Sequence, residues 1–218
     1  MFWIGVGVVV VLGIIGIAFA ATSGGGSKSR SGGGGSGGGG SKAALEFGKV
    51  TVEGKPLPTL PDSGPDPAKG ETAPILSGEN FQGEPVTIAP TGKPRMVVFL
   101  AHWCPHCNAE APRLAAYLAD AGMPTDVDLS IVPTGSDSSA PNWPPSQWVQ
   151  DMKLGNVQTL VDDKAQKAAR AYGLPSYPFI VLLDAQGKVI ERRSGEQEDG
   201  FFNGAFQQLT ASISSGAG

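Results

Sequence analysis

The two cysteines of this chain, Cys104 and Cys107, are separated by two residues, and the chain has no other cysteine. An apolar run, 96–101, precedes them, and a segment with helical spacing, 108–119, follows. A Cys-x-x-Cys motif at a strand-to-helix junction can cycle between a dithiol and a disulfide. We therefore expect thiol–disulfide chemistry at this junction.

The two cysteines have different expected roles. Cys104 should lie at the helix N-terminus, where partial positive charge and free N–H groups favour the thiolate, so it is the expected nucleophile. Cys107 lies one turn further along the same face and should resolve the mixed disulfide. Because the electrons reside in this redox-active pair, no separate cofactor is expected. The alternatives are a static disulfide and one half of a zinc site.

Three neighbouring residues are candidates for tuning the pair. A protonated His106 would add positive charge near Cys104, which favours the reduced form and makes the disulfide a better oxidant. Pro105 occupies the other position between the cysteines, and Trp103 precedes them. Trp103 either shields the site or packs in the core. The alternative for His106 is a solvated side chain without effect.

Two further side chains near the motif carry open interpretations. Glu110 takes or relays the proton of Cys107, or it is an exposed acid stabilised by the helix N-terminus. His102 could join His106 and the two cysteines in binding zinc or copper(I). Four ligands within six residues at a helix mouth would have strained geometry. We therefore expect no metal site.

Residues 1–21 are predicted to form a transmembrane anchor. Residues 2–20 are a run of 19 without a charge, and a helix of that length spans roughly 28 Å, close to the thickness of a bilayer core. A cleaved signal peptide is the alternative, because Ala18-Phe19-Ala20 has the form of a cleavage site.

The orientation of this anchor rests on conflicting signals. Lys28, Arg30 and Lys42 follow the span, and the positive-inside rule would place the domain in the cytoplasm. Disulfide chemistry on exported proteins favours the opposite side. We expect a single-pass cell-membrane protein whose domain faces the extracytoplasmic side.

Residues 22–72 are predicted to be a linker. The part from 22 to 41 is rich in Gly and Ser and contains Gly-Gly-Gly-Gly-Ser twice, which is typical of a flexible tether. Such repeats are also common in engineered linkers, and in that case the anchor is not native to the domain. Residues 43–72 contain many prolines and should be an extended connector, with one possible short strand at 50–52.

Residues 73–218 are predicted to form one compact domain. The apolar patterns predict strands at 75–76, 85–88, 96–101, 127–132, 157–161, 179–183 and 188–193. Helices are predicted at 110–119, 146–154, 163–172 and 200–213. This order describes an α/β fold with one mixed β-sheet flanked by helices.

The domain resembles the thioredoxin superfamily, most closely its membrane-tethered TlpA/ResA-like branch. The resemblance rests on Trp-Cys-x-x-Cys after an apolar strand, on Pro112 five residues later, and on Tyr172-Gly173-Leu174-Pro175-Ser176-Tyr177-Pro178. Glu110 stands where the branch has an active-site glutamate, and the element at 133–154 looks like its insertion. Cys-Pro-His-Cys itself resembles the motif of DsbA-type oxidases.

The resemblance implies a thioredoxin-like fold and a substrate-binding loop. Pro178 corresponds to the family's cis-proline, which would place the backbone of Tyr177 beside Cys104, where an extended substrate could pair with it. Val98 stands where many thioredoxins have a buried aspartate. This departure leaves open whether Glu110 replaces that acid in proton transfer.

The expected function is thiol–disulfide exchange on protein substrates, as an oxidase or a general interchange enzyme. A reductase of apocytochrome c or other exported thiols is the first alternative. A metal-binding chaperone that uses the Cys/His cluster is another, and a peroxidase is a third. The expected partners are protein thiols or disulfides and a membrane or soluble redox partner. The net charge of −4, without a basic stripe, argues against nucleic acid.

Overall fold

The computed structural model describes residues 43–215. The predicted anchor at 1–21 and the Gly/Ser-rich tether lie outside the described residues. Between residues 43 and 215, no helix is both long and apolar enough to cross a membrane.

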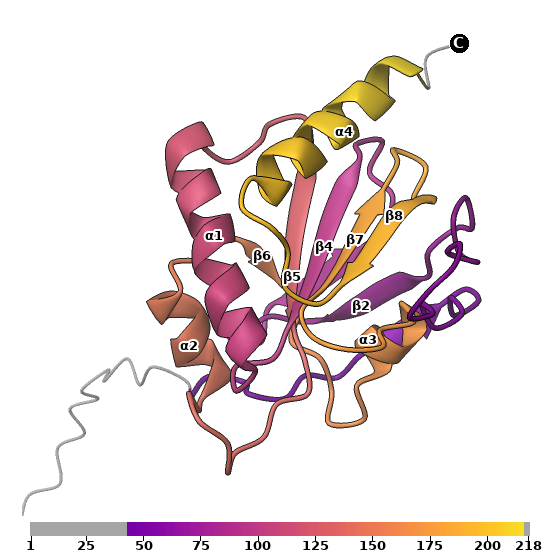
Figure 1. The fold of residues 1–218 in the computed structure, drawn as a ribbon. Helices are drawn as coiled ribbons and strands as arrows, with labels where there is room; N and C mark the ends of the chain where they lie inside the picture. Colours follow the sequence, from indigo (N-terminus) through magenta and orange to yellow (C-terminus); the bar gives the residue numbers. More distant parts are fainter. Residues whose placement is uncertain (1–42, 216–218) are drawn as a thin grey trace, which may run out of the picture. The chain divides into compact units, whose positions relative to one another are not determined.

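A five-stranded mixed sheet forms the centre of the domain (Figure 1). Its order is β6-β5-β4-β7-β8, with β4 parallel to β5 and antiparallel to β7. The strands are β4 (Arg95–Leu100), β5 (Asp128–Pro133), β6 (Gln158–Thr159), β7 (Phe179–Leu183) and β8 (Val189–Ser194). All residues of β4 and β7 are buried, as expected for apolar strands at the centre of a sheet that is covered on both faces.

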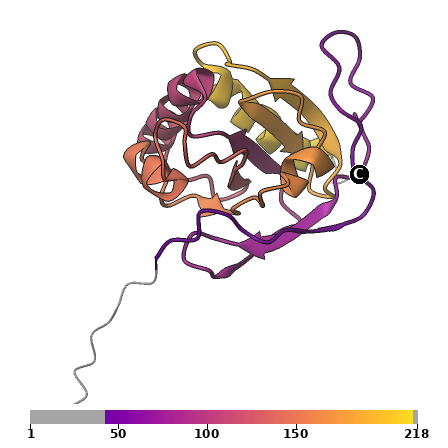
Figure 2. The ribbon, with the colours of Figure 1, turned by 90° about the horizontal axis from the view of Figure 1, so that it is seen from below.

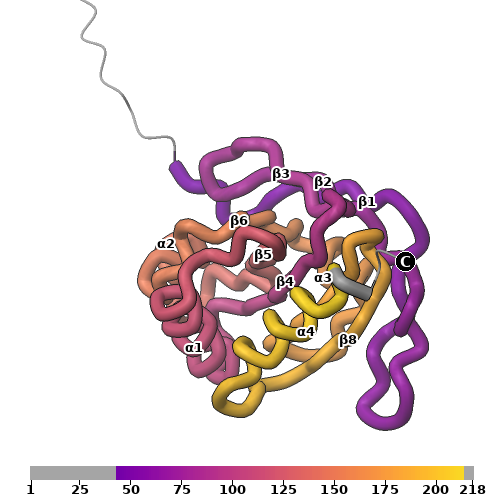
Figure 3. The backbone as a smooth tube through the Cα atoms, turned by 90° about the horizontal axis from the view of Figure 1, so that it is seen from above, coloured from indigo at the N-terminus to yellow at the C-terminus, as the bar shows by residue number. Residues whose placement is uncertain are grey.

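The two faces of this sheet are covered by different elements (Figure 3). Helices α1 (Pro105–Ala121), α2 (Pro145–Asp151) and α4 (Phe201–Ser215) pack on one face, against Val98 and its neighbours. Helix α3 (Lys167–Ala171) packs on the other face, against Phe99. Successive residues of β4 thus serve two separate cores, as the alternation of side chains along a strand requires.

A second, three-stranded antiparallel sheet corrects the prediction of one sheet. It consists of β1 (Thr51–Glu53), β2 (Ile75–Glu79) and β3 (Pro85–Ile88), in the order β1-β2-β3. Leu76 of β2 and Ile88 of β3 are buried in the same core as Phe99. The small sheet therefore covers a face of the central sheet instead of extending its edge.

The predicted boundary of the compact domain at Ala73 is also wrong, because parts of residues 43–72 pack on the domain, although one loop of this segment projects from it (Figure 2). Val50, Leu57 and Ala68 are buried. The buried side chain of Arg192 on β8 donates two hydrogen bonds to the carboxylate of Asp66. A buried guanidinium needs such a partner, so the Pro-rich segment is part of the fold.

Three elements are shorter than predicted. Helix α2 has seven residues instead of nine. Strand β6 has two residues instead of five, and α3 has five residues instead of ten. The residue before α3, Gln166, has a left-handed backbone with φ of 56°, so the helix begins at Lys167 and not at Asp163 as the sequence pattern suggested. The buried carboxylate of Asp162 accepts the N–H groups of Ala168 and Ala169 across this bend.

Candidate active site

The Cys-x-x-Cys motif lies at the junction between the end of β4 and the start of α1, as predicted. Cys104 is the N-cap residue of α1, with extended backbone angles, and Pro105 is the first helical residue. Proline suits this position because its fixed φ is helical and no N–H bond is lost there. Both cysteines are free thiols.

The two thiols differ in access and in acidity. Cys104 retains 5% exposure, whereas Cys107 is fully buried. The sulfur of Cys107 accepts a hydrogen bond from the backbone N–H of Ala101 at 3.4 Å, but burial raises the pKa of the Cys107 thiol far above its ordinary value. Cys104 is therefore the thiol that an incoming chain meets first.

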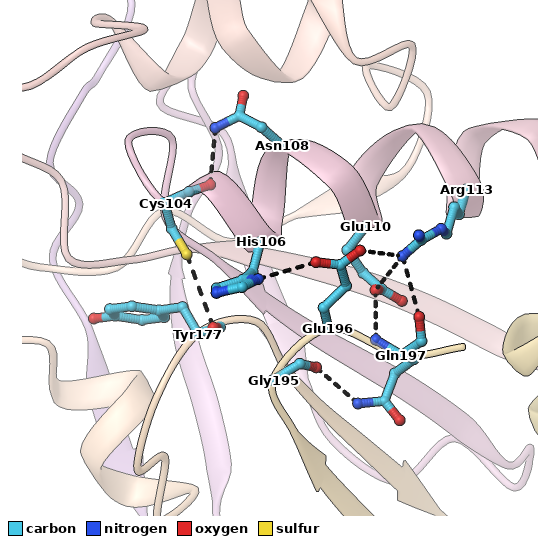
Figure 4. A network of polar contacts seen from close by, with 9 residues as sticks. All are labelled: Cys104, His106, Asn108, Glu110, Arg113, Tyr177, Gly195, Glu196 and Gln197. Carbon is cyan, nitrogen blue, oxygen red and sulfur yellow. Dashed lines mark hydrogen bonds and ion pairs between the residues drawn. The ribbon is translucent and has the colours of Figure 1, made fainter. Parts of the chain in front are cut away.

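The Tyr177–Pro178 loop faces Cys104 (Figure 4). This peptide bond is cis, and the Cys104 thiol lies 3.8 Å from the carbonyl oxygen of Tyr177. The indole N–H of Trp103 donates to the carbonyl of Gly135, and its ring contacts the Tyr177 ring edge-on at 5.8 Å. Both sequence interpretations of Trp103 thus apply, since it packs in the core and borders the site.

Glu110 is buried behind this site, and the interpretation as an exposed acid is wrong. Its side chain is 1% exposed. One carboxylate oxygen accepts the backbone N–H of Gln197 at 2.9 Å, and the other has no hydrogen-bond partner within residues 43–215. Burial raises the pKa of Glu110, although the Gln197 bond and Arg113 oppose that effect. A buried carboxyl with a raised pKa beside a redox-active pair is a candidate for proton transfer.

His106 makes a side-chain contact that the sequence did not predict. Its Nδ1 lies 2.9 Å from a carboxylate oxygen of Glu196, in the connection between β8 and α4. The other carboxylate oxygen of Glu196 lies 2.8 Å from the guanidinium of Arg113. The one signal that could have found Glu196 is that the chain must pass the start of α1 on its way from β8 to α4.

Asn108 ties the active-site turn to the insertion, and it too was missed. Its amide donates to the carbonyls of Cys104 and His102 at 2.8 and 3.1 Å. Its carbonyl accepts the indole N–H of Trp148 on α2 at 2.9 Å. The backbone at Cys104 is therefore held from the side of the insertion.

We predict that Asn108→Ala destabilises the fold by about 1–3 kcal/mol, because it leaves the buried Trp148 indole N–H without a partner. Urea unfolding measures this change. Gln147→Ala is the matched control, since Gln147 is exposed on α2, the helix that carries Trp148, and within residues 43–215 its side chain bonds to that of Asp151. An unfolding free energy for Asn108→Ala equal to that of the control would contradict the prediction.

His102 does not join a metal site in this arrangement. It is 1% exposed. Its Nδ1 bonds to the carbonyl of Pro141, and its Nε2 accepts the N–H of Asp137. Residues 43–215 contain no group of three or more His, Cys, Asp or Glu side chains that could hold a metal ion. His102 instead anchors the insertion loop.

Comparisons with known proteins agree with this geometry. The sequence model of the Redoxin family matches residues 68–209. Soluble secreted antigen MPT53 of Mycobacterium tuberculosis is 46% identical over 116 residues, which is 53% of this chain and 60% of that protein. Methylamine utilization protein MauD of Methylophilus methylotrophus is 26% identical over 134 residues, 60% of this chain and 57% of that protein.

Among solved structures, a secreted Mycobacterium tuberculosis disulfide oxidoreductase homologous to E. coli DsbE superposes with a TM-score of 0.50. It is 25% identical and aligns with 61% of this chain and 95% of its own. This chain spans less than two thirds of the length of the two curated relatives named above. The matches agree with the thioredoxin-like resemblance seen in the motifs.

Proposed function

Because this chain belongs to the Redoxin family, with a thioredoxin-like fold, we propose that it is a thiol–disulfide oxidoreductase acting on protein substrates through Cys104 and Cys107. The observation that carries the proposal is the placement of the Cys104 thiol 3.8 Å from the Tyr177 carbonyl, with Cys107 buried behind it. The backbone of Tyr177 can pair with an extended substrate strand, and this pairing would present a cysteine sulfur of the substrate to Cys104.

The reaction proceeds through a mixed disulfide. In the oxidising direction, a substrate thiolate attacks Cys104, its S–S bond to Cys107 breaks, and Cys107 leaves as a thiolate that takes up a proton. A second substrate thiolate then attacks the substrate sulfur of the mixed disulfide and releases the Cys104 thiolate. Two electrons pass from the substrate dithiol to the cysteine pair, so no separate cofactor takes part. In the reducing direction the same steps run backwards.

The proposed direction is oxidation or interchange, as the Cys-Pro-His-Cys motif suggests. Reduction of exported thiols, such as those of apocytochrome c, is the second candidate. The observation that favours it is the Glu196 carboxylate beside His106, which offsets positive charge at the helix mouth. Equilibration with glutathione decides between the two candidates, because a reduction potential near that of thioredoxin, about −270 mV, would exclude the oxidase direction.

The proposed site of action is the extracytoplasmic side of the membrane, with residues 1–21 as the anchor. The support is the apolar sequence of 2–20 and the description of a similar protein as soluble and secreted. Labelling of the Cys104 thiol in intact cells with a membrane-impermeant maleimide tests this location. Labelling that requires cell lysis would overturn it.

A further inference from the structure

We infer that Glu196 is a positioning residue that sets the redox poise of the Cys104/Cys107 pair through His106. The inference rests on the proposed function, and it assigns a role to a residue 90 positions away from His106 along the chain. Three observations carry it. His106 and Arg113 share the carboxylate of Glu196, and Glu196 and Glu110 share the guanidinium of Arg113. Both basic side chains lie in the N-terminal half of α1.

The carboxylate of Glu196 bridges two basic side chains of α1 (Figure 4). One oxygen accepts the Nδ1–H of His106 at 2.9 Å, and the other accepts a guanidinium N–H of Arg113 at 2.8 Å. The bridge is partly shielded, since the side chain of Glu196 is 31% exposed. Hydrogen bonds from both basic side chains lower the pKa of Glu196, so the carboxylate is ionised at neutral pH.

This bridge holds the His106 ring toward the connection between β8 and α4. It also places the negative charge of the Glu196 carboxylate beside the ring. A protonated imidazole stabilises a nearby thiolate through its positive charge. A carboxylate at hydrogen-bond distance cancels much of that charge at longer range. Glu196 therefore weakens the oxidising effect expected from histidine between the two cysteines.

Arg113 extends the bridge to the buried acid of the site. Its guanidinium lies 3.6 Å from the carboxylate of Glu110, and it also pairs with Asp199 at 3.1 Å. Glu196 thus competes with Glu110 for the same cation. The exposed His106 and the buried Glu110 are therefore linked through the carboxylate of Glu196 and the guanidinium of Arg113.

The expected direction follows from the electron balance. Reduction of the pair adds two electrons, with two protons when Cys104 ends as the thiol and one proton, on Cys107, when Cys104 ends as the thiolate. The Cys104 thiolate therefore exists only in the reduced form. Removing the negative charge of Glu196 leaves more positive charge beside that thiolate. The reduced form is then favoured, and the disulfide becomes a stronger oxidant.

The test measures the equilibrium constant of the full chain with glutathione at neutral pH. We expect Glu196→Gln to shift this constant about tenfold toward the reduced protein, or ~30 mV for a two-electron couple. In a His106→Ala background, the same substitution should shift it about threefold or less, because the coupled partner is gone. Asp199→Asn is the matched control, since among the ion pairs within residues 43–215 Asp199 contacts Arg113 and not His106; it should leave the constant unchanged.

Two results would overturn the inference. One is an unchanged constant in Glu196→Gln, and the other is an equal shift with and without His106, which would show a direct charge effect. Urea unfolding of each variant verifies that the fold is retained, and Glu196→Asp, which keeps the charge, should restore most of the wild-type value. If the wild-type chain exchanges no disulfides, the proposed function fails; if it exchanges them and Glu196→Gln behaves like wild type, only this inference fails.

Discussion

We expect the substitution of Cys104 by serine to abolish disulfide exchange. We expect the substitution of Cys107 by serine to halt exchange at the mixed disulfide. Cys104 is the thiol with residual exposure and the one that faces the Tyr177 carbonyl, so no other sulfur can start the reaction. Cys107 is buried and acts only after Cys104 has captured a substrate. Turnover of insulin disulfides measures the loss, and mass spectrometry of the Cys107→Ser variant detects the trapped substrate.

The two serine variants serve as controls for each other. Both replace one buried thiol in the same turn of α1, so damage to the fold should affect them alike. We expect an adduct on Cys104 in one variant and none on Cys107 in the other. Unchanged turnover in Cys104→Ser, or capture of substrate by Cys107 in that variant, would contradict the assigned order of attack.

Replacing Glu110 with glutamine slows the resolving step on the order of 10²-fold at neutral pH, if the buried carboxyl carries the proton of Cys107. Burial raises the pKa of both groups, and a proton acceptor inside the domain lowers the barrier to forming the Cys107 thiolate. Single-turnover kinetics from a preformed mixed disulfide measure this step separately from the initial attack. A resolving rate equal to that of the wild type would remove Glu110 from proton transfer.

The same substitution changes stability with a definite sign. Because burial raises the pKa of Glu110 above its ordinary value of 4.5, its favourable contribution is complete below that value and is lost as the pH rises through the folded-state pKa. Glutamine does not titrate. Glu110→Gln should therefore match the wild type in acid and become the more stable protein toward neutral pH. Urea unfolding across this range tests the sign, with the exposed Glu53→Gln as control.

The sequence was sufficient for the features that depend on local patterns. The apolar runs of β4 and β7 are buried on both faces, and a strand with that composition has few other places in an α/β domain. The Cys-x-x-Cys motif needs only the end of one strand and the start of one helix. The Tyr177–Pro178 loop was found because it belongs to a recognisable segment.

The features that escaped prediction depend on contacts between distant polar residues. Asn108 meets Trp148, and His106 meets Glu196, only after the sheet and helices have packed. No periodicity marks such pairs, since a single glutamate in a connection looks like any solvated residue. The sequence left Glu110 open between proton transfer and an exposed acid, because an acid near a helix N-terminus is favourable even in solvent.

The ion pair between Asp66 and Arg192 has a practical consequence for the choice of truncated fragments of this chain. A fragment that starts at Ala73 would keep the arginine and lose its counter-ion, since Asp66 lies upstream of that point. Stranding an interior cation in this way typically costs 3–5 kcal/mol, a large part of the roughly 5–15 kcal/mol that holds a domain together. The smallest excised piece expected to stay folded therefore begins before Val50, with the proline-rich stretch included.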